Sequence, residues 1–376
     1  MTVSRLFLVV LTVLSVSLAG AAEGLEYVFK SGTDGYNTYR IPAIVMSKKG
    51  TLLAFAEGRV NHSGDHGNLD IVLKRSTDGG KSWSDLVMVQ DDGNNQCGNP
   101  APVVDRKSGR IFLLSNGSTA SEGAVMQGKA TRECYIQYSD DDGLTWSPRR
   151  NISDQVRPEG WRWYAMGPCS GIQIQEGRNK GRLVVAANHS DEKGSYQSHS
   201  LYSDDAGKTW KVGVTAELGS NESQIAEVSP DLLVQNMRMQ THGQGVRAIR
   251  TSSDGGKTWT PLKHEAQLPC PRCQGSVIRD YSARGRLFFS NPAAQPRTRK
   301  QMTIRVSRDG GKTWPLKKVV YDGPSGYSNL VMLGKDRVGI LYEAGLKDLA
   351  EGIAFHVYAV RDINEKVASP SKGELK

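Results

Sequence analysis

Arg40 is the residue whose surroundings first suggest chemistry. It lies in the segment Tyr39-Arg40-Ile41-Pro42, between aromatic and apolar side chains, where a solvent-facing arginine is not expected. A guanidinium in such a segment either pairs with a carboxylate of the protein or binds an anionic ligand. The segment by itself favours the structural ion pair, so its meaning depends on the rest of the sequence.

Two other spacings could hold a metal ion. His62 and His66 lie four residues apart, but they could share a metal only on a helix, and the Gly-rich polar stretch around them is not helical. Cys270-Pro-Arg-Cys273 has the spacing of zinc and redox sites, yet no second Cys or His pair occurs at ligand spacing. We therefore predict a loop with an optional local disulfide, and no metal or cofactor. The five cysteines cannot all pair within one chain, and their pairing stays open: Cys97, Cys134, Cys169, Cys270 and Cys273.

A repeated octet indicates the architecture that must position these residues. The pattern Ser-x-Asp-x-Gly-x-(Ser/Thr)-Trp begins at five places, separated by 63, 64, 49 and 55 residues: Ser76, Ser139, Ser203, Ser252 and Ser307. In each copy the Asp side chain can accept backbone N–H bonds, Gly allows positive φ, and Trp can anchor the next strand. We predict that each octet is a hairpin corner with a structural role.

Short apolar or alternating segments precede the octets and have the composition of strands. Residues 39–45 and 52–55 form such segments before the first octet, and residues 330–333, 338–342 and 355–360 do so after the last. A period near 59 residues, which is 355 residues divided by six, fits a ring of six units with five marked by octets. The prediction is an all-β, six-bladed β-propeller with four-stranded blades in a single domain, residues 22–376.

The Tyr39-Arg40-Ile41-Pro42 segment followed by five octets resembles the sialidase (neuraminidase) family, whose octets are called Asp boxes. The resemblance covers essentially the whole chain after its first 21 residues. It implies a six-bladed propeller with the active site at the centre of the ring, and hydrolysis of terminal sialic acid with retention and without a metal. Asp boxes occur in other propellers, so the combination carries the resemblance.

The family binds the substrate carboxylate with three arginines, and Arg40 corresponds to the first. The resemblance implies that the second lies in residues 245–250, where box spacing favours Arg247 over Arg250. It implies that the third is Arg299, with Arg297 as the rival. Planar guanidinium groups suit a carboxylate attached to the anomeric carbon because they bind it with charge-assisted hydrogen bonds.

The resemblance also supplies catalytic roles. Tyr327, in Gly326-Tyr327-Ser328-Asn329, matches the family's nucleophile, and sialidases are an exception among retaining glycosidases in using tyrosine. Glu227 is predicted as the base that activates it. Asp65 is predicted as the acid/base aspartate, with nearby Asp70 as the competitor that looks more structural.

Further residues are expected around the substrate. Glu343 matches a family glutamate that orients Arg40, and Arg59 and Asn99 are candidates for the pocket wall. Residues 161–164 contain three aromatic side chains, for which core packing is the usual explanation. Their place in a long connection between octets nevertheless suggests a substrate rim.

The chain's start and charge bear on location and partners. Residues 1–21 have the charged start, apolar core and small final residues of a signal peptide, which predicts a secreted or periplasmic protein without stable membrane insertion. Without them the formal charge is 47 minus 39, or +8. The basic residues are scattered, so no nucleic acid partner is predicted. The expected substrates are sialylated glycoproteins, glycolipids or oligosaccharides; trans-sialidase, intramolecular trans-sialidase and a non-catalytic sialic-acid-binding propeller are the alternatives.

Overall fold

Strands form nearly all the regular structure in the computed structural model, which describes residues 25–294 and 297–367. The helices within these residues have five residues or fewer: α1 (Glu122–Met126), α2 (Ser153–Val156), η1 (Leu349–Glu351) and η2 (Val360–Asp362). The predicted all-β class is confirmed. No helix in the described ranges is long and apolar enough to cross a bilayer. The predicted signal peptide, residues 1–21, lies outside them.

The strands form four sheets in which the neighbours are almost all antiparallel. One sheet contains β2 (Thr38–Met46), β3 (Leu52–Arg59), β4 (Leu69–Ser76), β5 (Val87–Gln90), β6 (Gln96–Val104), β7 (Ile111–Ser118), β8 (Glu133–Ser139) and β9 (Arg150–Asn151). The second contains β10 (Tyr164–Met166), β11 (Ile172–Gln173), β12 (Leu183–Ser190), β13 (Tyr196–Ser203) and β14 (Lys211–Val212). The third contains β15 (Ser220–Ser229), β16 (Leu232–Met239), β17 (Val246–Ser252) and β18 (Lys263–Pro269). The fourth contains β19 (Ser276–Arg279), β20 (Leu287–Pro292), β21 (Lys300–Ser307), β22 (Leu316–Leu333), β23 (Arg337–Ala344), β24 (Gly352–Ala359), β25 (Glu365–Lys366) and β1 (Tyr27–Lys30).

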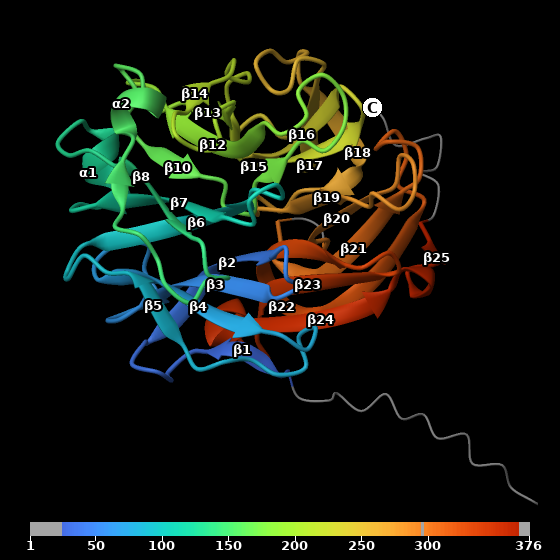
Figure 1. Ribbon diagram of the computed structural model, residues 1–376, viewed down its shortest axis with the longest axis horizontal. Coiled ribbons are helices and arrows are strands. Elements are labelled where there is room, and N and C mark those ends of the chain that lie inside the picture. Colours follow the sequence, from blue (N-terminus) through green and yellow to red (C-terminus); the bar gives the residue numbers. More distant parts are fainter. Residues whose placement is uncertain (1–24, 295–296, 368–376) are drawn as a thin grey trace, which may run out of the picture.

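The sheets follow one another around a common centre, so that the colours in Figure 1 pass from blue through green and yellow to red around the molecule. The early strand β1 pairs antiparallel with the late strand β24, with Tyr27 opposite Ala354. Hydrogen bonds of a sheet thus join the beginning and the end of the described chain. Contacts between early and late residues are therefore possible near the centre.

The octets form the predicted corners. In the first, Gly80 N donates to Ser76 Oγ at 2.8 Å, and Lys81 N and Ser82 N both donate to Asp78 Oδ1 at 3.0 Å. The Ser76 hydroxyl also donates to Asp78 Oδ1 at 2.8 Å. The other four copies repeat this serine–aspartate bond at 2.8 Å and the bond from glycine N to the serine Oγ. The structural role predicted for the octets is confirmed.

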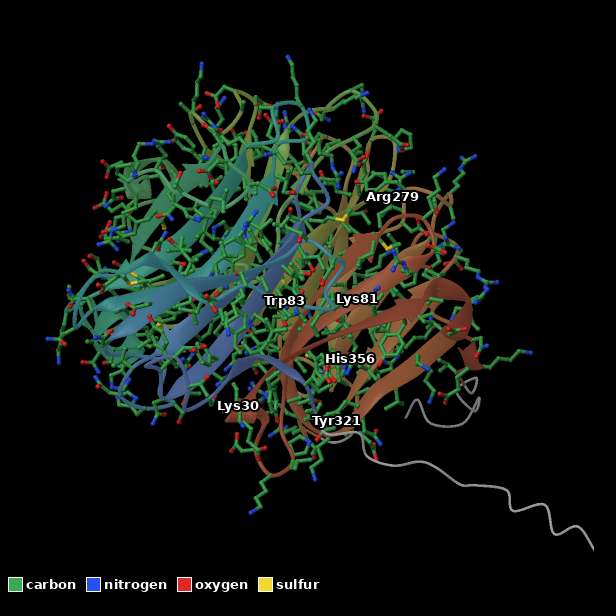
Figure 2. All side chains as sticks on the ribbon, turned by 60° about the horizontal axis from the view of Figure 1, so that its bottom comes forward. Lys30, Lys81, Trp83, Arg279, Tyr321 and His356 are labelled. Atoms are coloured by element: carbon green, nitrogen blue, oxygen red, sulfur yellow. The ribbon has the colours of Figure 1, made fainter. Side chains whose placement is uncertain are left out.

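Two octet tryptophans pack edge-on against phenylalanine rings. Trp83 lies edge-on to Phe355, with the ring centroids 5.4 Å apart, and Figure 2 labels Trp83 together with Lys81 of the same turn. Trp314 packs in the same manner on Phe289, at 6.0 Å. Trp83 thereby ties the turn after β4 to β24 of the fourth sheet, whereas Trp314 and Phe289 belong to one sheet.

Candidate active site

A polar pocket of about 220 Å³ lies where β2, β6, β10, β15 and β22 meet. Seven of the residues singled out from the sequence line it: Arg40, Arg59, Asp65, Asn99, Trp163, Arg299 and Tyr327. These residues come from widely separated parts of the chain. Their convergence depends on the ring-like succession of the sheets.

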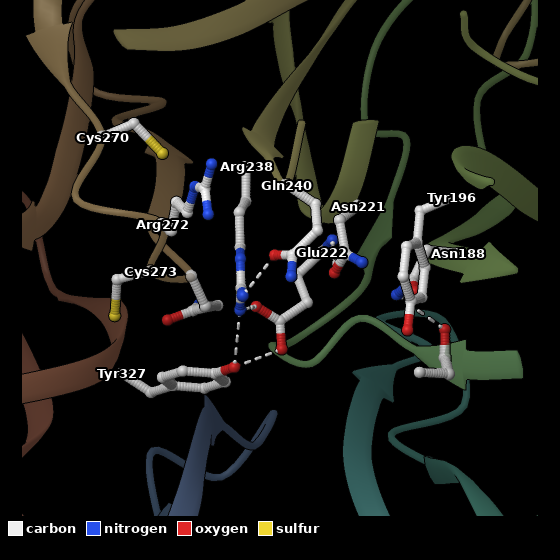
Figure 3. A network of polar contacts seen from close by, with 12 residues as sticks. Asn188, Tyr196, Asn221, Glu222, Arg238, Gln240, Cys270, Arg272, Cys273 and Tyr327 are labelled. Atoms are coloured by element: carbon white, nitrogen blue, oxygen red, sulfur yellow. Dashed lines mark hydrogen bonds and ion pairs between the residues drawn. The ribbon is translucent and has the colours of Figure 1, made fainter. Parts of the chain in front are cut away.

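Tyr327 lies at the base of the pocket and is 7% exposed. Its hydroxyl donates a short hydrogen bond to Glu222 Oε1 and accepts one from Arg238 Nη1 at 3.1 Å, as Figure 3 shows. The guanidinium carbons of Arg40 and Arg299 lie 5.6 and 5.7 Å from the centroid of its ring. The phenol therefore has one carboxylate acceptor and three neighbouring positive charges.

Opposing effects act on the ionisation of Tyr327. Burial and the negative charge of Glu222 raise the pKa of its hydroxyl well above the ordinary value, whereas Arg238 and Arg299 act to lower it. The hydroxyl is accordingly protonated in the free protein at neutral pH. It can become a nucleophile only if Glu222 takes the proton as a bond forms to the phenolic oxygen.

Glu222 and Arg238 are pocket residues that the sequence did not identify. Glu222 lies on β15 and Arg238 on the next strand, β16, and Arg238 Nη1 donates to Glu222 Oε2 at 2.6 Å. The sequence did contain one indication of this pair. Glu222 and Arg238 lie at nearly equal distances along the chain on the two sides of the Pro230-Asp231 turn. Antiparallel pairing across such a turn brings an acidic and a basic side chain together.

The structure contradicts the expected contact between Glu227 and Tyr327. Glu227 Oε2 instead accepts from Tyr281 Oη at 2.8 Å and from Gln175 N at 2.9 Å, and its carboxylate faces a separate cavity of about 400 Å³. Glu227 lies five positions along β15 from Glu222, which is about 16 Å of strand. The choice of glutamate was wrong because local sequence did not fix which end of β15 reaches the pocket.

Arg247 is likewise absent from the pocket. It is 0% exposed, its Nε donates to Asn236 Oδ1 at 2.6 Å, and its Nη1 donates to the carbonyl of Cys273 at 2.7 Å. The rival Arg250 is also buried elsewhere, donating to Gln235 Oε1 at 2.8 Å. Both lie on β17, whereas the pocket guanidinium, Arg238, comes from β16, one strand nearer the centre.

Arg40 and Tyr327 share one buried carboxylate. Glu343, which is 0% exposed, accepts from Arg40 Nε at 2.7 Å and from Ile41 N at 2.9 Å through Oε1, and from Tyr327 N at 2.9 Å through Oε2. Burial opposes the charge of Arg40, but Glu343 outweighs it and raises the pKa of the guanidinium. The placement agrees with the orienting role expected of Glu343 and adds a direct bond to the backbone of Tyr327.

The third arginine of the pocket is Arg299. Its rival, Arg297, has an exposed side chain and does not line the pocket. Arg299 Nη2 donates to the backbone carbonyl of Arg272 at 2.8 Å, which leaves the rest of its guanidinium facing Tyr327.

Asp65 projects into the open part of the pocket, with 73% of its side chain exposed. Its Oδ1 lies 2.7 Å from Arg59 Nη2, and the same guanidinium is held by Glu57 Oε2 at 2.7 Å. Partial burial acts to raise the pKa of Asp65, but Arg59 and Arg40 outweigh it and lower the pKa. The competitor Asp70 does not line the pocket and accepts from Tyr36 Oη at 2.8 Å.

Asn99 lines the pocket beside Arg132. Its Oδ1 accepts from Arg132 Nη2 at 2.6 Å, and the Arg132 guanidinium stacks over the Trp163 ring at 4.1 Å. Of the aromatic residues at 161–164, Trp163 thus reaches the pocket, whereas Trp161 stacks on His189 with centroids 3.3 Å apart. Of the three aromatic residues suggested as a substrate rim, only Trp163 therefore lines the pocket.

No group of three or more His, Cys, Asp or Glu side chains arranged for a metal ion occurs among residues 25–294 and 297–367. All five cysteines are free and buried.

Known proteins are similar to this chain in sequence and in fold. Residues 50–340 match the model of a BNR repeat-like domain. A sialidase of Micromonospora viridifaciens is 34% identical over 332 residues, covering 84% of this chain and 51% of the relative. A sialidase of Bacteroides fragilis is 33% identical over 361 residues, covering 89% of this chain and 64% of the relative. The solved structure of the Hadza microbial sialidase Hz136 has a TM-score of 0.82 and 33% identity, covering 90% of this chain and 69% of that one.

The family model covers all five octets, whose residues lie between 76 and 314. The chain belongs to the sialidase family with BNR repeats. It spans about half of the length of the Micromonospora relative and about two thirds of the Bacteroides relative.

Proposed function

We propose that the chain is an exo-α-sialidase that hydrolyses terminal α-linked sialic acids of glycoproteins, glycolipids or oligosaccharides. The observation that carries the proposal is the convergence of three arginines on the Tyr327–Glu222 pair in one pocket: Arg40, Arg238 and Arg299. A sialic acid has a carboxylate on its anomeric carbon, and a pocket with three guanidinium groups suits that anion. The same groups then place the anomeric carbon near the tyrosine hydroxyl.

A tyrosine nucleophile follows from the charge of such a substrate. A carboxylate attacking the anomeric carbon would be repelled by the substrate's own carboxylate, whereas a phenol approaches uncharged. In the proposed first step Tyr327 Oη forms a bond to the anomeric carbon as its proton passes to Glu222. The neighbouring arginines stabilise the negative charge that develops on the phenolic oxygen.

Asp65 is the proposed acid/base. The bond from the anomeric carbon to the leaving oxygen breaks as Asp65, in its protonated form, gives that oxygen a proton. In the second step Asp65 takes a proton from the attacking water, whose oxygen bonds to the anomeric carbon as the bond to Tyr327 Oη breaks, and Glu222 returns the proton to the phenolic oxygen. Asp65 is held as a carboxylate by Arg59 in the free protein. A bound sugar must therefore exclude water from Asp65 and weaken its contact with Arg59 before the acid can act. Two displacements at one carbon give net retention.

A fluorogenic aryl sialoside tests the activity directly. The purified protein should release the fluorophore, and Tyr327→Phe should not, while an aryl galactoside serves as the control substrate for both proteins. NMR of the first product formed should show the α-anomer of the free sugar. An inactive wild-type protein, or equal turnover by Tyr327→Phe, would contradict the proposal; a transferred or anhydro product would show a trans-sialidase instead.

We further infer a six-bladed ring. The support is the pairing pattern: β4 and β6 share a sheet through one residue pair, Leu69 with Gln96, and the long strand β22 pairs with β21 through its first half and with β23 through its second. Dividing the sheets at these two places gives six antiparallel units. Export through residues 1–21 is also proposed, on their composition alone.

A further inference from the structure

The cavity of about 400 Å³ that Glu227 faces, the Glu227 cavity, lies at the other end of the strands that build the Tyr327 pocket. Strand β2 contributes Arg40 to the pocket and residues 44–46 to the cavity. Strand β22 contributes Tyr327 to the pocket and residues 330–332 to the cavity. The inner strands therefore carry a second hollow, which the proposed sialidase chemistry does not use.

A layer of buried amide and hydroxyl side chains lies between the cavity and the pocket. Asn329 is buried, accepts from Ser170 N at 3.0 Å through Oδ1, and donates to Ser276 Oγ at 3.1 Å through Nδ2. Ser276 Oγ in turn donates to Gln224 Oε1 at 2.7 Å. Because these groups are bonded to one another, a molecule in the Glu227 cavity is separated from Tyr327.

Arg279, a cavity residue on β19 that Figure 2 labels, has incomplete hydrogen bonding. The residue is 8% exposed, and its Nε and Nη1 are buried without a hydrogen-bond partner among residues 25–294 and 297–367. Its Nη2 forms an ion pair with Glu176 Oε2 at 2.8 Å, whereas Nη1 lies 3.7 Å from Glu227 Oε1, beyond hydrogen-bonding distance. Buried donors of a charged group are normally bonded, so these two nitrogens call for an acceptor.

The two carboxylates of the cavity wall are already engaged by other donors. Glu227 accepts from two backbone N–H groups, at 2.9 and 3.0 Å, and from Tyr281 Oη at 2.8 Å. Asp280 is 1% exposed and accepts from Arg286 Nε at 2.6 Å. Neither carboxylate therefore bonds Arg279 Nε or Nη1.

The rest of the wall combines positive charge with apolar surface. Arg106 and Lys335 line the cavity and are exposed, so that with Arg279 the wall has three cationic side chains against the two engaged carboxylates. Partly exposed apolar side chains from β2, β6, β11, β19 and β22 complete much of it: Met46, Val104, Ile172, Ile278 and Met332. A ligand that is anionic at one end and apolar at the other matches such a wall.

We propose that the Glu227 cavity binds a small amphiphilic anion, an organic carboxylate with an apolar body. Its head accepts hydrogen bonds from Arg279, and its body lies against the apolar wall. A carboxylate suits the head because it is purely an acceptor and its charge offsets that of the guanidinium. The volume of about 400 Å³ is in the range of small-molecule pockets, about 300–1,000 Å³. This site does not depend on the proposed sialidase function.

Arg305 provides a matched comparison within the same chain. The residue is 7% exposed, and its Nε and Nη1 also lack hydrogen-bond partners in the part of the chain that the structure describes. Arg305 lies on β21, however, and lines neither the Tyr327 pocket nor the Glu227 cavity. Unbonded nitrogens alone therefore do not mark a site. Arg279 differs because it borders a cavity that can hold a ligand.

Calorimetric titration of the purified protein with sodium octanoate tests the ligand class. We expect octanoate to bind at a single site. Octanol, which lacks the charge, and acetate, which lacks the apolar body, should each bind at least about tenfold more weakly. Equal affinities for octanoate and octanol, or no binding of octanoate, would overturn the proposal. This comparison needs only the wild type, so it remains decisive if a variant does not fold.

Three variants test the location of the site. Arg279→Gln should weaken octanoate binding about tenfold and leave octanol binding unchanged, because only the charged contact is lost. Arg305→Gln is the matched control and should bind octanoate as the wild type does. Met46→Trp, which fills part of the cavity, should prevent binding of octanoate. Wild-type affinity for octanoate in folded Arg279→Gln or Met46→Trp protein would overturn the proposal, as would an equal loss in Arg305→Gln.

Discussion

The octet turns and the Tyr327 pocket use the same kinds of contact over very different lengths of chain. In the first octet, Asp78 binds the backbone of residues three and four positions ahead. In the pocket, Arg40 pairs with Glu343 across 303 positions, and Tyr327 bonds Glu222 across 105. An octet can therefore form within one hairpin, whereas the pocket requires the beginning and end of the chain to meet. Substitutions in the two regions should have separable consequences.

The largest effect is expected from Tyr327→Phe, which removes the proposed nucleophile and leaves the buried ring. We expect kcat/KM on an aryl sialoside to fall at least about a thousandfold, with little change in melting temperature, because the ring packing remains. Kinetics and calorimetry on the same preparation check this. If Tyr327→Phe instead fails to fold, the hydroxyl is needed for the structure and its role as nucleophile is contradicted.

The next effect separates two glutamates on one strand. Glu222→Gln should lower kcat about a hundredfold, because the base for Tyr327 is lost. Glu227→Gln should leave kcat unchanged and cost about 1–3 kcal/mol of the free energy of unfolding, because the buried carboxylate accepts hydrogen bonds from Gln175 N and Tyr281 Oη. Equal effects of the two substitutions on kcat would contradict the assignment of Glu222.

The two glutamates also show which parts of the structure could be predicted from the sequence. The octets were predictable as turns because every group in them lies within eight residues. The structure also brings together Arg40, Tyr327 and Glu343, which were chosen from their local motifs. The sequence analysis missed Glu222 and Arg238 because a residue reaches the pocket only if it lies at the end of its strand that faces the centre. Which end faces the centre depends on the register of β15 with β16 and on the neighbouring sheets, and it cannot be predicted from the local composition of the strands.

A smaller effect should distinguish two neighbouring arginines. Arg299→Lys replaces the planar guanidinium with a single ammonium group and should raise KM about tenfold. Arg297→Lys should leave KM unchanged because the side chain is exposed outside the pocket. Steady-state kinetics on the two purified variants measures this, and the reverse order of effects would show that Arg297 contacts the substrate.

The smallest effect concerns the octets and depends on pH. In the second octet, hydrogen bonds from the side chain and backbone of Thr145 lower the pKa of Asp141 to about 2 from its ordinary 3.8. A lowered pKa in the folded state stabilises the protein above pH 3.8, and this stabilisation is lost as the pH falls from 3.8 through about 2. Asp141→Asn should therefore lower the melting temperature at neutral pH more than at acidic pH, without changing KM.

The central claim is that Tyr327 attacks the anomeric carbon. The most direct measurement is peptide mapping by mass spectrometry after incubation with a 2,3-difluorosialic acid, in which fluoride leaves from the anomeric carbon and the second fluorine slows release of the sugar. The proposed mechanism predicts a monofluorosialyl adduct on the peptide containing Tyr327, and no adduct in Tyr327→Phe. An adduct on Glu222, Asp65 or any other residue would contradict it.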